Sequence, residues 1–159
     1  MKMNFLANLH PQVVHFPIAF FLVYALLEII GIIFRKEYFS RTAHLFLFFG
    51  VLGAVAAVLS GNSAVDAAKQ LGSKGVNIAA GAIEDHEELA NITMWYFTGL
   101  LVLRTFLALR KKFSGKMKIL FIFLALLGSF LVYRTGQLGG RLVYKHGIGT
   151  DLLKGEIRK

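Results

Sequence analysis

The sequence contains no cysteine, and it is poor in proline and in acidic residues. Its 159 residues include 2 Pro, 9 Asp and Glu and 18 Lys and Arg, and only 17% are charged, against about 25% in an ordinary soluble domain. The absence of cysteine excludes disulfides, thiolate-bound zinc, cysteine-ligated iron–sulfur clusters and covalently attached c-type haem. The hydrophobic content of 56%, with 15 Phe, is too high for a disordered chain and exceeds what a soluble fold of this length can bury.

Four long apolar segments account for this composition. A bilayer crossing needs about 20 apolar residues, and an isolated span must be a helix because lipid cannot satisfy open backbone polar groups. A soluble four-helix bundle is disfavoured because segments such as 18–33 lack a polar stripe. We therefore predict an all-α fold, a four-helix transmembrane bundle that forms one integral-membrane domain over residues 1–159. Its predicted parts are helices at about 12–34, 42–60, 86–110 and 118–138, an outer loop at 61–85 and a C-terminal tail at 139–159.

The distribution of the net charge of +9 predicts the topology. The loop after the first helix carries Arg35, Lys36 and Arg41, and the segment 110–118 carries five basic residues and no acid. The connection between the second and third helices is acidic instead. The positive-inside rule places the two basic loops in the cytoplasm and both termini outside. The basic residues thus indicate orientation, and we expect no nucleic acid partner.

Four of the five histidines fall on the predicted outer face: His10, His15, His86 and His146. Neutral imidazole is the commonest metal ligand and an axial ligand of haem, and helix bundles hold cofactors with side chains from facing helices. Any one of these residues alone is more often an ordinary wet interfacial histidine. His44 lies on the cytoplasmic side, and we expect it to play no part.

Prolines shape the first helix near two of these histidines. Pro11 suits the first helical position, which would place His10 at the helix cap. Pro17 lies inside the helix, removes the backbone hydrogen bond to Val13 and predicts a bend two residues past His15. Such a bend either makes room for a cofactor or is only structural.

The end of the fourth helix is rich in glycine and basic residues. Gly136 and Gly140 have the spacing that allows close helix approach, and the same lack of bulk would let a flat macrocycle lie against the backbone. Arg134, Arg141 and Lys145 bracket this run. They are candidate partners for haem propionates, or else a basic collar for lipid phosphate.

Two charges lie within the predicted bilayer, Glu28 and Arg104. Each is six residues from the cytoplasmic end of its helix, about 9 Å inside the boundary at 1.5 Å per residue. Because intramembrane charges pair or face the interior, we predict an ion pair between the first and third helices.

Two motifs carry a family resemblance: HPQVVHFPIA at residues 10–19 and GGRLVYKHGIG at residues 139–149, with His86 and Asn91 between them. They resemble the bacterial predicted membrane proteins of the domain-of-unknown-function family 2231. The resemblance implies a four-helix domain of the bacterial inner membrane. Relatives occur fused to or encoded beside c-type cytochrome and Rieske-type modules, which implies respiratory electron transfer.

The leading functional hypothesis is a small b-type cytochrome. Haem b would be held by pairs drawn from the four outer histidines and would pass electrons between a quinol and an external cytochrome c or Rieske-type protein. One alternative is a zinc, copper or iron site of these histidines with Glu84, Asp85 or Glu87. Another is a cofactor-free accessory or anchor subunit of a respiratory complex, or a homo-oligomer. A stand-alone hydrolase is disfavoured because the sequence has no nucleophile motif and no HExxH.

Overall fold

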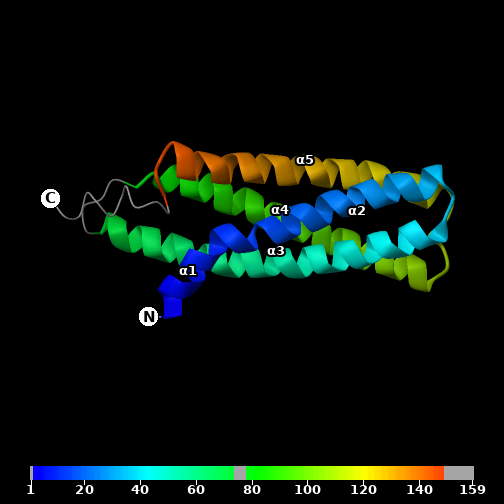
Figure 1. The fold of residues 1–159 in the computed structure, drawn as a ribbon, viewed down its shortest axis with the longest axis horizontal. Coiled ribbons are helices and arrows are strands. Elements are labelled where there is room, and N and C mark those ends of the chain that lie inside the picture. The colour runs from blue at the N-terminus through cyan, green and yellow to red at the C-terminus, as the bar shows by residue number, and fades with distance from the viewer. Residues whose placement is uncertain (1, 74–77, 149–159) are drawn as a thin grey trace.

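The computed structural model describes residues 2–73 and 78–148, which are helical and contain no strand. The helices are α1 (Lys2–Val13), α2 (His15–Ile33), α3 (Glu37–Gly72), α4 (Ala80–Leu109) and α5 (Lys116–Tyr144). The long helices lie side by side along one axis (Figure 1). The turns that join α2 to α3 and α4 to α5 are at one end, and α1, the start of α4 and the last turns of α3 and α5 are at the other.

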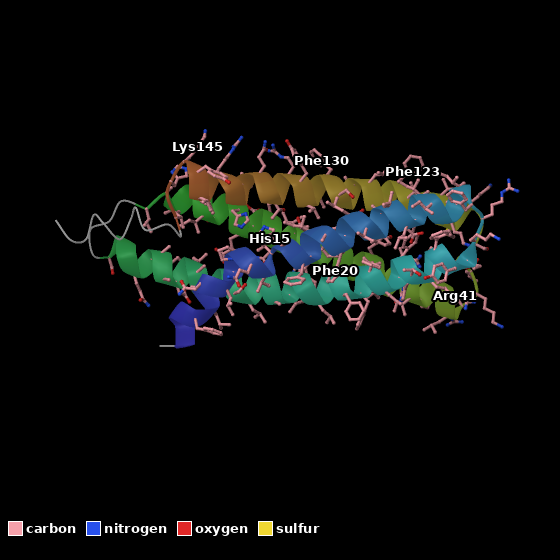
Figure 2. All side chains as sticks on the ribbon, viewed as in Figure 1. His15, Phe20, Arg41, Phe123, Phe130 and Lys145 are labelled. Carbon is pink, nitrogen blue, oxygen red and sulfur yellow. The ribbon has the colours of Figure 1, made fainter. Side chains whose placement is uncertain are left out.

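Four helical spans in the described part of the chain are long and apolar enough to cross a membrane. They are Phe5–Ile33, which combines α1 and α2, then Glu37–Gln70, Ala80–Leu109 and Lys116–Tyr144. Large apolar side chains such as Phe123 and Phe130 point outward from the bundle (Figure 2), as lipid-facing residues do. The predicted all-α, four-helix transmembrane architecture is confirmed.

The helices are longer than the sequence predicts. Residues 61–72, expected in an outer loop, continue α3, and α5 runs to Tyr144, into the expected tail. The segment 62–71 is rich in Ala, a strong helix former. Its helix is also held by packing, because Ala68, Ile83 and Leu142 form a small apolar cluster of their own where α3, α4 and α5 meet.

The first span differs from expectation at its start. Helix α1 begins at Lys2, so Pro11 is inside a helix and His10 is not a helix cap. The interruption falls at Val14, one residue before His15, rather than two residues past it. Because Pro17 has no N–H, the helix loses one bond here, and the N–H of Ile18 reaches the carbonyl of Val14 only at 3.4 Å.

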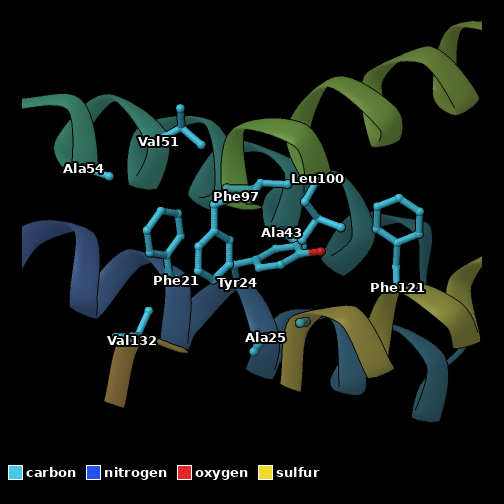
Figure 3. Packing of buried hydrophobic residues seen from close by; sticks show 12 residues of the cluster. Phe21, Tyr24, Ala25, Ala43, Val51, Ala54, Phe97, Leu100, Phe121 and Val132 are labelled. Atoms are coloured by element: carbon cyan, nitrogen blue, oxygen red, sulfur yellow. The ribbon is translucent and has the colours of Figure 1, made fainter. Parts of the chain in front are cut away.

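The centre of the bundle is a stacked pair of rings. Helices α2 and α4 occupy opposite corners, and each packs against both α3 and α5. Phe21 of α2 and Phe97 of α4 meet across the bundle with ring centroids 3.6 Å apart (Figure 3). Gly50 and Gly128 make the room for them, because a Cβ at either glycine would lie 2.5 Å from the neighbouring ring. The two diagonal helices therefore touch through side chains that only glycine neighbours can accommodate.

A buried ion pair joins the same two helices nearer the turns. Arg104 Nε donates to Glu28 Oε1 at 2.8 Å, and each residue is only 2% exposed. Arg104 also donates to the carbonyl of Ser40 at 2.9 Å and to its Oγ at 3.2 Å, and its guanidinium lies 4.1 Å from the ring centroid of Phe113. The ion pair predicted from the sequence is thus present, and it is tied to α3 as well.

Removing one partner of this pair should destabilise the protein strongly. Arg104→Gln leaves Glu28 buried without its counter-ion, and we expect the free energy of unfolding to fall by about 3–5 kcal/mol. Arg134→Gln is the matched control, because it breaks an exposed bond to Gln137 and should cost under about 1 kcal/mol. Equilibrium unfolding in mixed detergent micelles measures both, and equal stability of Arg104→Gln and wild type would contradict the assignment.

Candidate functional site

The structure brings together two of the four outer histidines. His10 of α1 and His86 of α4 are half-buried and close enough to interact electrostatically. His15 and His146 are exposed (Figure 2 shows His15). Within the described ranges, no three His, Asp or Glu side chains are arranged to hold a metal ion. The candidate site is therefore a histidine pair.

The ring of His10 is fixed by α3. Its Nδ1 lies 3.0 Å from Ser60 Oγ, and that hydroxyl donates its own hydrogen to the carbonyl of Ala57 at 3.0 Å. With the single Ser60 hydrogen directed to Ala57, Nδ1 carries the N–H that Ser60 accepts. The lone pair of the neutral imidazole is then on Nε2, which is how histidines that bind a metal through Nε2 are usually oriented. Gly61 lets the ring lie close to α3, because a Cβ there would be 3.1 Å from His10 Cε1.

The ring of His86 has a similar setting on α5. It lies against Gly139, where a Cβ would be 3.0 Å from His86 Cε1, and the backbone of Thr135 is nearby. Its Nδ1 is buried and has no hydrogen-bond partner among the described residues. Leaving such an atom unpaired costs about 1–3 kcal/mol, and the described residues leave the Tyr24 hydroxyl and the Nδ1 of His44 unpaired in the same way.

A short polar layer lies next to the pair. Thr93 Oγ1 donates to the carbonyl of Leu89 at 2.7 Å and is 2.9 Å from Thr135 Oγ1. These hydroxyls link α4 to α5 just inside His86, so the half of the site that carries His86 is held in register by hydrogen bonds and not by apolar packing alone.

The other predicted site residues lie around the pair at the surface. Arg134, Arg141 and Lys145 are exposed on or just after α5, and Arg134 donates to Gln137 at 2.7 Å. Lys145 is at the outer edge of this end (Figure 2). Glu84 and Asp85 are exposed as well.

The glycine spacing predicted to allow close approach is not the one that does so. A Cβ at Gly136 or Gly140 would meet none of the described atoms within 4 Å, whereas Gly139 between them is in tight contact with His86. His44 is far from this end of the bundle and within electrostatic range of Arg104 instead.

A comparison with protein families identifies the chain. The model of the family described as "Predicted membrane protein (DUF2231)" matches residues 6–152, which include both site histidines and the buried ion pair. The chain belongs to the DUF2231 family. Neither a curated protein nor a solved structure matches it, so the site of this DUF2231 protein must be interpreted from its own geometry.

Ser60 should contribute measurably to this geometry. In Ser60→Ala the buried Nδ1–H of His10 loses its acceptor, and we expect the free energy of unfolding to fall by about 1 kcal/mol or more. Ser63→Ala is the control, since Ser63 makes only a weak local bond of 3.4 Å to Leu59. Unfolding in mixed micelles compares the two, and an equal effect of both substitutions would count against a specific Ser60–His10 bond.

Proposed function

We propose that this DUF2231 protein binds haem b between His10 and His86 and transfers electrons at the outer face of the membrane. The observation that supports this most is the pair itself. Two half-buried imidazoles come from different helices, α1 and α4; one has its Nδ1 at the Ser60 hydroxyl and the other has a buried Nδ1 with no hydrogen-bond partner among the described residues.

The number of donors favours haem over a bare metal ion. The porphyrin supplies four nitrogens to the iron, so the protein needs to add only two axial ligands. Zinc sites use three or four protein ligands, and the described residues offer no such group. A zinc, copper or iron site is the second candidate and would need a further ligand. A cofactor-free accessory or anchor subunit is the third, and it leaves the unpartnered His86 nitrogen without a role.

The chain's own residues would have distinct tasks around the haem. His10 and His86 hold it, Ser60 fixes the tautomer of His10, and the bundle excludes water from the side that faces the core. Arg134, Arg141 and Lys145 are exposed cations on the nearby surface of α5, suited to propionate carboxylates. When bound, the haem would supply reversible one-electron chemistry.

The setting of the site suggests its partners. We place the basic turns in the cytoplasm and the histidine end outside, with both termini on that side, in a bacterial inner membrane. A quinol in the bilayer is the proposed donor. Exposed Glu84, Asp85 and Glu88 form an acidic patch at the start of α4. This patch would attract a basic region of an external acceptor such as a cytochrome c or a Rieske-type protein.

Visible spectra of the purified protein test the haem proposal. We expect a Soret band and a sharp α-band on reduction, both lost in His10→Ala and in His86→Ala because each removes an axial ligand. His15→Ala, His146→Ala and His44→Ala are matched controls that should keep the full haem content. A colourless protein, or haem retained in both His10→Ala and His86→Ala, would refute the assignment.

The absence of cysteine makes the orientation easy to test. Single cysteines at Lys112, in the basic turn, and at Glu88, near the histidine end, are both exposed positions. A membrane-impermeant maleimide applied to intact spheroplasts should label Glu88→Cys, and it should label Lys112→Cys only after lysis. The reverse pattern would invert the proposed topology.

A further inference from the structure

The two halves of the bundle repeat one another with a fixed offset. Glu28 and Arg104 are 76 positions apart, and the same offset relates the last residue of α2, Ile33, to the last residue of α4, Leu109. The turns after these helices also correspond. Arg35 and Lys111, again 76 positions apart, are the two non-glycine residues with positive φ in the described ranges, at 50° and 55°.

This offset also relates the residues that face each other across the bundle. His10 corresponds to His86, and the two half-buried imidazoles are within electrostatic range of each other. Phe21 corresponds to Phe97, and the two rings stack. Glu28 corresponds to Arg104, and the two side chains form the ion pair. Residues that occupy equivalent positions thus meet one another, as they do on a two-fold axis.

The second helix of each half shows the same relation at an offset of 78, which allows for a longer second turn. Gly50, which lies beside Phe21, corresponds to Gly128, which lies beside Phe97. Likewise Gly61, against His10, corresponds to Gly139, against His86. The backbone neighbours of the two imidazoles, Ala57 and Thr135, correspond as well.

We propose that the chain is a tandem repeat of one helical hairpin, with a pseudo-two-fold axis along the bundle, and that His10 and His86 form a single ligand site on that axis. This inference rests in part on the proposed function: the site takes one haem per chain, with its two faces held by equivalent imidazoles. Four histidines serving two haems would not follow this symmetry, because position 91, which corresponds to His15, is Asn.

The residue identities on the axis fit this interpretation. Two carboxylates or two guanidinium groups at the buried positions 28 and 104 would repel, so a two-fold-related pair there must become one acid and one base. Neutral imidazoles have no such conflict and can bind the same centre from opposite sides. His, Phe and both supporting glycines are the same in the two halves, whereas the neighbouring positions Ser60 and Leu138 have diverged.

Matched glycine substitutions test the shared site. Gly61→Ala and Gly139→Ala each push a methyl group against their own imidazole, at 3.1 and 3.0 Å. We expect both to shift the haem midpoint potential in the same direction and to weaken haem affinity by about 10-fold or more. Gly136→Ala is the control, because it makes the same helix-propensity change without a contact. A haem-to-chain ratio of two, or an effect of only one of the two glycines, would overturn the shared site.

An exchange of charges tests the repeat without reference to haem. Arg104 bonds to Ser40 of the neighbouring helix, and Lys118 occupies the equivalent position beside Glu28. Glu28→Arg with Arg104→Glu should lower the melting temperature in detergent, and adding Ser40→Lys and Lys118→Ser should restore most of it. The fourfold variant being no more stable than the double variant would contradict the repeat.

The glycine substitutions and the charge exchange together distinguish the haem function from the repeat. A colourless protein whose fourfold exchange is restored refutes the haem function and supports the repeat. A haem protein whose ratio is two, or whose glycine variants differ, supports haem binding and electron transfer but refutes the single site between His10 and His86.

Discussion

The architecture depends on the contact of two helices that are not neighbours. Helices α2 and α4 sit at opposite corners and meet where large or charged side chains reach the axis, as in the Phe21–Phe97 stack and the Glu28–Arg104 pair. In a membrane, helices gain nothing from hiding apolar surface, so close packing and buried polar bonds must hold them. Small residues on α3 and α5 supply the room, and the histidine pair is placed by the same geometry.

Composition and charge were sufficient to predict the architecture and the buried ion pair. Hydropathy predicts the spans because lipid imposes helices of a minimum length, and two opposite charges at one depth can hardly avoid pairing. The ends of the helices could not be predicted, because the continuation of α3 to Gly72 depends on packing against Ile83 and Leu142, which are distant in sequence. For the same reason Pro11 indicates a helix start that the structure does not have.

The candidate site was predictable only in part. Following the histidines along the predicted spans places four of them at one end of the bundle. It cannot distinguish His10 and His86, which are half-buried, from His15 and His146, which are exposed. Ser60 and Gly61 carry no local signal. The repeat at 76 positions does carry one, since it singles out the two histidines that have a histidine as their counterpart. It is visible in the sequence once the contacts show which offset to use.

In this account the two equivalent halves of the chain meet at a pair of imidazoles. The repeat explains why His10 and His86 have matching positions and matching glycine neighbours. Near-infrared magnetic circular dichroism of the oxidised protein tests this account most directly, because it reports both axial ligands of a ferric haem. We predict the low-spin signature of two histidine nitrogens, lost when either His10 or His86 is replaced. A high-spin or singly histidine-ligated haem, or no haem signal at all, would contradict the account.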